Sequence, residues 1–308
     1  MSFEKEMETA LSAVTEACGI CVRAREGGIY KETKADGTPV TAADYAAQFV
    51  IVRSIARRFP ADGIVAEETP SFQNRQMAEE VLKLLPEAGA DEMAEMVSRG
   101  GDAERFWAID PIDGTAGFIE GAQFAVAAAL VENGEPALGI LGCPGLGFIM
   151  CGARGRGVRK VDVKKAQSGK GAWEKPRGRG TVLCETARGT EEAYSVTREI
   201  MGEIEKSAGE TETIRMDGQC KYALVAAGRA DVFMRVPNSG GKGGRRENIW
   251  DHAAGAAVVS AAGGKVSDFY GNPLDFGAGV TLAENNGVVA SAGAVADGIM
   301  EAIRKTGF

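Results

Sequence analysis

The order of strand-like and helix-like segments changes partway along this chain, and the change limits the folds open to it. Between residues 106 and 161, short apolar segments follow one another, and Asn133-Gly134 joins two of them as in an antiparallel hairpin. Further along, strand-like and helical segments alternate. We therefore expect a layered protein of the α+β or α/β class, with an α+β part at residues 1–178 and an α/β part at residues 179–308.

Local patterns place several elements of the first part. A helix is predicted over Ser2–Arg25, followed by a loop over residues 34–40. A second helix is predicted over Thr41–Phe59, because Thr41 and Asp44 have the spacing of a capping box. Residues 74–98 are polar and mainly helical in pattern.

The second part is predicted to close with a helix, a hairpin and a last strand. The small-residue stretch 250–264 indicates a helix that Asp251 caps and that two glycines end. Residues 265–276 are typical of a hairpin, and residues 288–291 of a strand.

Composition excludes several classes of protein. With 44% hydrophobic and 25% charged residues among 308, the chain can bury a hydrophobic core that is stable without disulfide bridges. It has no apolar run of the ~18 residues that a membrane helix needs. The net charge of −8 argues against nucleic acid as a partner. The N-terminus does not resemble a signal peptide, so we expect a soluble protein of the cytoplasm.

The six cysteines are scattered along the chain, which suits a reducing compartment. Cys18 and Cys21 form a CxxC pair, a spacing that also occurs in redox and zinc sites. Both lie on an apolar stripe with helical spacing, there is no second such pair, and the chain has a single histidine. Buried helix cysteines are the better interpretation.

The segment DPIDGT at residues 110–115 carries the strongest chemical signal. It follows a short predicted strand, so Asp110, Asp113 and the Ile112 carbonyl can point at one spot. A helix that starts at Thr115 offers free N–H groups to an anion. Carboxylates for a hard cation beside amides for phosphate suit metal-assisted phosphate hydrolysis. Taken alone, however, the segment is also compatible with a tight turn capped by aspartate.

Other acids stand at the ends of predicted elements. Glu67 and Glu68 follow a short strand, Asp251 starts a helix, and Asp44 lies in the first turn of another helix. Each alone is more typical of a cap or a solvated acid. Together they favour a shared site, because few folds need so many acids at element ends for stability.

These residues resemble the lithium-sensitive, magnesium-dependent phosphatase superfamily that includes inositol monophosphatase and the 3'(2'),5'-bisphosphate nucleotidases. The resemblance rests on PVTAAD (39–44), GIVAEET (63–69), WAIDPIDGTAGF (107–118) and WDHAAGAAVVSAAGGKVSD (250–268), in the family's order. It implies a layered α/β/α/β/α sandwich and two or three Mg²⁺ ions.

The resemblance also implies roles for single residues. The magnesium ligands would be Glu67, Asp110, the Ile112 carbonyl, Asp113 and Asp251. Asp44 and Thr115 would position and deprotonate the attacking water, with Glu67 as a further catalytic residue. The amides of Gly114 and Thr115 would bind the phosphate. The substrate-binding residues would be Gly218, Lys221 and Arg235.

Two segments resemble the bisphosphate nucleotidases more than the inositol monophosphatases. One is AGF after Thr115, and the other is DGQCKY at residues 217–222, where the nucleotidases normally have serine in place of Gly218. Lys221 suits a second phosphate, although its position also fits the start of a helix.

A histidine that the nucleotidases often place after the strand at residues 181–186 is missing. Arg188 or Tyr194 could stack on adenine instead. The single histidine, His252, is expected to pack or hydrogen-bond locally.

We therefore expect removal of the 3'-phosphate from 3'-phosphoadenosine 5'-phosphate, with its sulfated analogue as a second substrate. The alternatives are an inositol phosphate phosphatase and a catalytically silent binder of metal and nucleotide. The sequence does not fix the oligomeric state or the role of residues 74–98. The basic segments 170–180 and 240–246 are either solvated loops or the border of an anion site.

Overall fold

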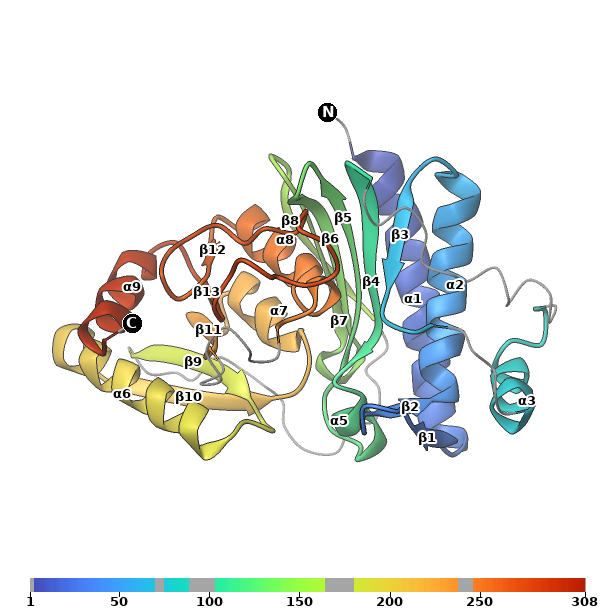
Figure 1. The fold of residues 1–308 in the computed structure, drawn as a ribbon, viewed down its shortest axis with the longest axis horizontal. Helices are drawn as coiled ribbons and strands as arrows, with labels where there is room; N and C mark the ends of the chain where they lie inside the picture. Colours follow the sequence, from blue (N-terminus) through green and yellow to red (C-terminus); the bar gives the residue numbers. More distant parts are fainter. Residues whose placement is uncertain (1–2, 70–74, 89–102, 164–179, 238–245, 308) are drawn as a thin grey trace.

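The computed structural model arranges the chain in five layers, which Figure 1 shows side by side. Two helices cover each outer side, and two more helices lie between two sheets. In order across the molecule, the helices are α1 (Glu4–Gly27) and α2 (Ala42–Arg58), then α7 (Cys220–Ala226) and α8 (Ala253–Ala261), then α6 (Glu191–Ala208) and α9 (Ala296–Lys305). The structure describes residues 3–69, 75–88, 103–163, 180–237 and 246–307.

The first sheet has six strands in the order β3-β4-β5-β6-β7-β8. The pairing of β3 with β4 is parallel, and the other pairs are antiparallel. The strands are β3 (Gly63–Ala66), β4 (Arg105–Asp113), β5 (Ala125–Glu132), β6 (Glu135–Cys143), β7 (Phe148–Ala153) and β8 (Gly157–Asp162). The predicted hairpin turn is confirmed, with Asn133 at φ +52° and Gly134 at φ +75°.

The second sheet has five strands in the order β10-β9-β11-β13-β12. Strand β9 pairs in parallel with β10 and β11, whereas β13 is antiparallel to β11 and β12. The strands are β9 (Thr181–Thr186), β10 (Thr211–Met216), β11 (Val232–Arg235), β12 (Lys265–Ser267) and β13 (Val288–Ser291).

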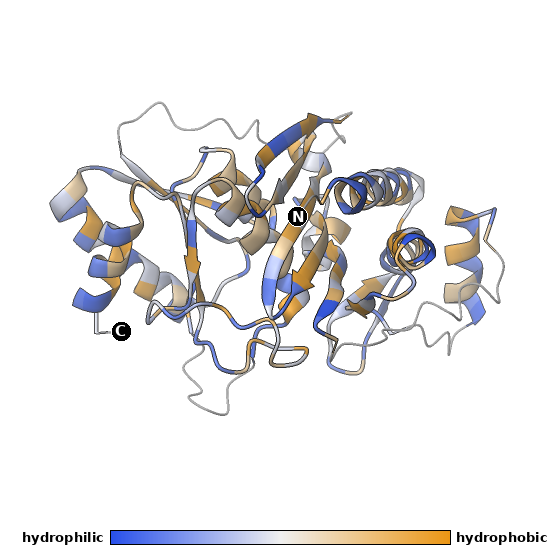
Figure 2. Ribbon diagram, turned by 90° about the horizontal axis from the view of Figure 1, so that it is seen from above, coloured by the Kyte–Doolittle hydropathy of each residue, from blue (hydrophilic) through white to orange (hydrophobic). Residues whose placement is uncertain are grey.

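Three hydrophobic cores fill the spaces between the five layers, and one of them lies on both sides of α7 and α8. Several strands of the first sheet are coloured as hydrophobic in Figure 2. Small residues let α8 lie close against the first sheet. A Cβ atom at Gly139 would come within 2.4 Å of the Ala254 carbonyl oxygen. On the other face of β6, a Cβ atom at Gly142 would come within 2.4 Å of the Cys18 sulfur. The sheet can therefore be covered tightly on both faces.

The layered fold class predicted from the sequence is confirmed, as are most of its elements. Thr41 caps α2, and its capping box with Asp44 is complete. Cys18 and Cys21 are buried on α1 as free thiols, which agrees with the interpretation as helix cysteines. Among the helices in the described part of the chain, none combines the length and the apolar character that crossing a membrane requires.

Some local predictions were wrong. The expected loop at residues 34–40 overlaps β2 (Pro39–Thr41), which pairs with β1 (Lys31–Thr33). Residues 265–276 do not form a hairpin: β12 pairs with β13 instead. The chain turns after β12 because the Asp268 carboxylate accepts backbone N–H bonds from Tyr270 and Asn272.

Some predicted segments lie partly or wholly beyond the described residues. Helix α3 (Arg75–Leu84) accounts for the first part of the polar excursion at residues 74–98, and residues 89–98 fall outside the description. The same is true of residues 170–179 and 240–245, which make up nearly all of the two basic segments.

Candidate active site

The segment DPIDGT forms a bulged strand end followed by a tight turn. Strand β4 continues through Asp113, with a bulge between Asp110 and Asp113 that interrupts its pairing with β5. The Asp110 carboxylate accepts a hydrogen bond from the Ile112 N–H at 3.1 Å. Gly114 adopts φ +92°, a left-handed conformation that favours glycine, and α5 (Thr115–Ile119) starts directly after it. The bulge lets both aspartates face the same region.

Asp110, Asp113 and Asp251, which we call the acidic cluster, come together from two distant segments. Each offers a carboxylate oxygen, and these oxygens all lie within 4.8 Å of one another. Asp251 ends a 3₁₀ turn, Ile249–Asp251, just before α8. The prediction that Asp251 caps α8 is wrong, because His252 occupies the N-cap position and no side chain makes a capping bond there. The carboxylate of Asp251 is thus directed to the cluster and not to the helix backbone.

Burial raises the pKa of each carboxyl in the acidic cluster. For Asp110, the charges of Glu67 and Asp113 add to burial and hold the pKa well above its usual range. For Asp251, burial and then the charge of Asp113 raise the pKa to about 7. A bound cation would relieve this repulsion, and carboxylate oxygens are ligands that suit a hard divalent ion. The cluster therefore fits a metal such as magnesium.

Glu67 and Glu68 follow β3 and share a lysine partner that the sequence analysis missed. The Lys34 ammonium lies 3.2 Å from Glu67 Oε1 and 2.5 Å from Glu68 Oε1. Glu68 is only 3% exposed, and burial raises its pKa to about 8. Burial of Lys34 favours its neutral form, but the two glutamates outweigh this and raise its pKa. Lys34 therefore supplies positive charge beside the acids.

Asp44 and Thr115 meet although 71 residues separate them in the sequence. The Thr115 hydroxyl lies 3.2 Å from Asp44 Oδ1 and 2.9 Å from the Ile112 carbonyl oxygen, and it can donate its single hydrogen to either. The other carboxylate oxygen of Asp44 accepts bonds from the Thr41 N–H at 2.8 Å and hydroxyl at 2.6 Å. Burial, only partly offset by Thr41, raises the pKa of Asp44 to about 7.

A pocket of about 250 Å³ connects the acidic cluster with the predicted substrate-binding residues. It takes side chains from the end of β4, from the loops after β9 and β10, and from α7 and the 3₁₀ turn. The residues used below are Asp113, Arg188, Asp217, Lys221, Arg235 and Asp251. Larger cavities occur elsewhere on the described surface, but this is the pocket that Asp113 and Asp251 line.

Gly218, one of the predicted substrate-binding residues, lies where a side chain does not fit. Its φ of +67° is in the left-handed region. A Cβ atom there would lie 2.4 Å from the Asp113 carbonyl oxygen and 3.1 Å from the Ala125 nitrogen. The backbone of Gly218 therefore touches the turn that carries the acidic cluster.

The cations of the pocket already have protein partners. The Lys221 ammonium is buried and donates to the Gly218 carbonyl at 2.6 Å. Arg235 donates from Nε to Glu247 Oε1 at 3.0 Å. Burial alone raises the pKa of Glu247, but His252 and Arg235 outweigh it and lower that pKa to about 2. Lys221 lies in the first turn of α7 and also lines the pocket.

His252 is engaged locally through both ring nitrogens, as the sequence predicted. Nδ1 lies 2.7 Å from the Tyr222 hydroxyl, and Nε2 lies 3.3 Å from Glu247 Oε2. Tyr194 is also engaged, since its hydroxyl donates to the Thr186 carbonyl and Arg215 lies 4.2 Å from its ring centroid. The sequence did not predict which partners His252 and Tyr194 would have, because these contacts join segments that no local motif connects.

The fold and the acidic cluster together define a five-layered α/β protein with a carboxylate cluster of the kind that can hold a divalent cation. The model of the inositol monophosphatase family matches residues 4–307. The chain belongs to this family.

Individual relatives agree with this placement. The 3'(2'),5'-bisphosphate nucleotidase of Schizosaccharomyces pombe is 34% identical over 98% of this chain and 96% of its own length. That of Emericella nidulans is 34% identical over 99% of both chains. The structure of an IMPase of Thermotoga maritima superposes with a TM-score of 0.67 at 23% identity, covering 98% of this chain and 97% of its own. The family, the fold and the enzyme class predicted from the sequence, a phosphoric monoester hydrolase, are confirmed.

Proposed function

We propose that this enzyme hydrolyses the 3'-phosphate of 3'-phosphoadenosine 5'-phosphate to AMP and inorganic phosphate, with magnesium as its cofactor. The pocket of about 250 Å³ supports this most directly, because it brings Asp113 and Asp251 together with Lys221 and Arg235. A substrate with one phosphate ester to be cleaved and a second anionic group matches such a mixture of charges. The bisphosphate nucleotidase name of the relatives supports the same substrate class.

The oxygen donors around the acidic cluster are proposed to hold two or three magnesium ions. They are Glu67, Asp110, the Ile112 carbonyl, Asp113 and Asp251. When bound, magnesium supplies the positive charge that offsets the phosphate and favours ionisation of water. Glu67, one of these donors, is also proposed as a catalytic residue.

Asp44 and Thr115 are proposed to orient and deprotonate the attacking water. The water would donate to Thr115 Oγ1 while the Thr115 hydroxyl donates to Asp44 Oδ1, a pair now 3.2 Å apart. An Asp44 pKa of about 7 suits proton acceptance near neutral pH. The Gly114 and Thr115 amides would hold the phosphate oxygens while the water oxygen forms its bond to phosphorus and the bond from phosphorus to the 3' oxygen breaks. The 3' oxygen would take up a proton from a solvent water.

Several further expectations go with this proposal. The sulfated analogue would lose its 3'-phosphate at the same site. The enzyme would work in the cytoplasm, without a nucleic acid or membrane partner. The division into parts at residues 1–178 and 179–308 also stays a prediction.

The direct test is phosphate release by the purified protein with magnesium. We expect strong preference for 3'-phosphoadenosine 5'-phosphate over inositol 1-phosphate, loss of activity in chelator, and inhibition by lithium. A preference for the inositol ester would overturn the substrate assignment and favour the inositol phosphatase. No release from either would favour the silent binder.

A further inference from the structure

Among the cations of the pocket, Arg188 has the ion-pair partner that a ligand can displace most easily. It lies just after β9 and reaches Glu120, which directly follows α5. Its guanidinium faces both oxygens of Glu120, with Nη2 at 3.0 Å and Nη1 at 3.4 Å. Glu120 is 65% exposed, whereas the partner of Arg235, Glu247, is 14% exposed. An exposed ion pair contributes about 1 kcal/mol or less, so a stronger anion can replace Glu120.

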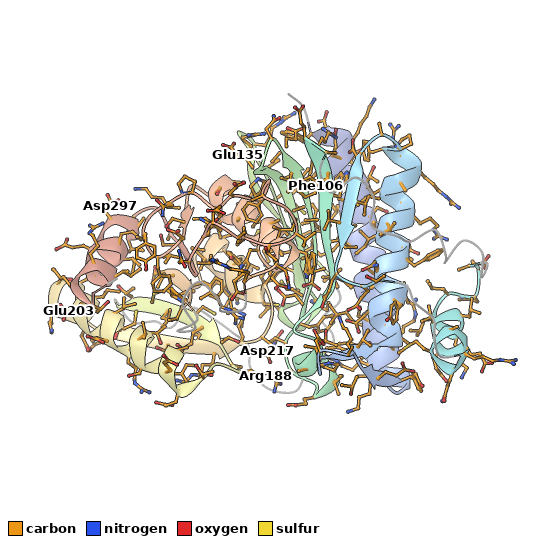
Figure 3. The ribbon with its side chains drawn as sticks, viewed as in Figure 1. Phe106, Glu135, Arg188, Glu203, Asp217 and Asp297 are labelled. Atoms are coloured by element: carbon orange, nitrogen blue, oxygen red, sulfur yellow. The ribbon has the colours of Figure 1, made fainter. Side chains whose placement is uncertain are left out.

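The other side of Arg188 is fixed. Its Nε lies 3.4 Å from Asp217 Oδ1, and the side chain of Asp217 is only 7% exposed. Figure 3 shows Arg188 and Asp217 close together near α5, between the first and second sheets. Asp217 thus holds the base of the guanidinium while its outer nitrogens face Glu120. This leaves the two outer nitrogens as a preformed fork for an anion.

The position of this fork is tied to the predicted phosphate-binding turn. A Cβ atom at Gly117 would lie 2.5 Å from Asp217 Oδ2, and one at Gly114 would lie 3.2 Å from the Asp217 Cβ. Asp217 is therefore pressed against the backbone of the DGT turn and the helix that follows. Because Asp217 also contacts Arg188, the guanidinium has a fixed distance from the place where the reacting phosphate is expected.

We propose that Arg188 is a specificity residue that exchanges the Glu120 carboxylate for the second phosphate of a bisphosphorylated substrate. This inference rests on the proposed function and adds a residue to it. Before substrate binds, Glu120 neutralises Arg188 and holds it across the pocket from the α5 side. On binding, the phosphate takes both outer nitrogens in a bidentate pair, and Glu120 returns to solvent.

Kinetics with two substrates test the exchange. The substrates are 3'-phosphoadenosine 5'-phosphate and 3'-AMP, which lacks the second phosphate. Arg188→Gln should lower the ratio of their kcat/KM values by about tenfold to a hundredfold, mainly through KM for the bisphosphate. Arg188→Lys should recover only part of the ratio, because an ammonium has no fork. Arg198→Gln removes another exposed arginine–glutamate pair, with Glu191, and should leave both substrates unchanged.

Glu120→Gln separates the proposal from a merely structural ion pair. If Glu120 competes with the phosphate, this variant should raise the preference for the bisphosphate by about twofold to fivefold. If the pair only stabilises the site, Glu120→Gln should instead weaken activity in the same direction as Arg188→Gln, which would overturn the proposal. Equal losses on both substrates in Arg188→Gln would also overturn it. If the unchanged enzyme hydrolyses neither substrate, the proposed function falls first, and this inference with it.

Discussion

The acidic cluster and the cations of the same pocket are built in opposite ways. The acids are short side chains brought together from two segments, and burial together with the charges of neighbouring acids raises the pKa values of Asp110 and Asp251. The cations are long side chains, and each already has an oxygen partner: Gly218 for Lys221, Glu247 for Arg235, and Glu120 with Asp217 for Arg188. The carboxylates of the acidic cluster therefore repel one another, whereas the cations are already neutralised by their protein partners.

This difference suggests how the site divides its work. A group of buried acids that repel one another favours uptake of a cation, because binding reduces the repulsion. Cations that already have protein partners bind an anion only when the anion replaces those partners. This favours ligands with suitable geometry over ligands that merely carry charge. Changes to the acids should therefore affect the rate most, and changes near the cations should affect selectivity.

The largest effect is expected for Asp110→Asn. Loss of a carboxylate from the acidic cluster should lower kcat/KM for phosphate release by about a thousandfold or more, since metal binding contributes several kcal/mol. In chelator the same variant should unfold at an equal or higher temperature, because it removes repulsion. Asp162→Asn, which changes an exposed acid on β8, should alter neither property. A lower unfolding temperature for Asp110→Asn would show that the cluster is not strained.

Thr115→Ala should follow, with kcat lowered by about a hundredfold to a thousandfold. The variant removes the hydroxyl that faces Asp44 Oδ1 but keeps the backbone amide and the start of α5. Circular dichroism should show an unchanged fold. Thr9→Ala removes a hydroxyl that bonds within α1 and serves as the matched control. Retained activity in Thr115→Ala would contradict the proposed deprotonation route.

Gly218→Ser should have an intermediate effect. Its Cβ would meet the Asp113 carbonyl oxygen at 2.4 Å, so the contact between the two sides of the pocket must open. We expect stability to fall by about 1–3 kcal/mol and kcat/KM to fall about tenfold. Gly228→Ser has nearly the same φ, +64°, with nothing within 4 Å, and should cost stability alone. Full activity in Gly218→Ser would mean that the turn can shift freely.

The same contrast explains what the sequence could predict. The acids and Thr115 lie in short motifs at element ends, where local spacing and turn chemistry determine the direction of a side chain, so the sequence could single them out. Lys34 and Glu247 were missed because their roles depend on partners from other segments. The expected cap by Asp251 failed for a similar reason: a 3₁₀ turn precedes α8 and redirects the carboxylate. Likewise, β12 pairs with β13, which no local pattern indicates.

The two sides of the pocket should also respond oppositely to pH. Asp251 has a folded-state pKa of about 7, against about 4 in an unfolded chain. Between these values the folded state binds more protons, so stability falls as the pH rises from about 4 to 7. Glu247 has a folded-state pKa of about 2, below its unfolded value of about 4.3. Its contribution is present above about pH 4 and is lost as the pH falls towards 2.

Thermal unfolding in chelator between about pH 3 and pH 8 should therefore separate the two acids, and this is the smallest effect that we predict. Asp251→Asn should raise Tm at pH 8, where its carboxylate is ionised and repelled, and should change little near pH 4. Glu247→Gln should lower Tm at pH 8 by an amount that corresponds to about 1–3 kcal/mol, and it should flatten the acid limb. Magnesium should raise Tm at pH 8 in the unchanged protein more than in Asp251→Asn. If Asp251→Asn instead lowers Tm at pH 8, the hydrogen bond from Asn248 at 3.3 Å would outweigh the repulsion, and the acidic cluster would be as well compensated as the cations.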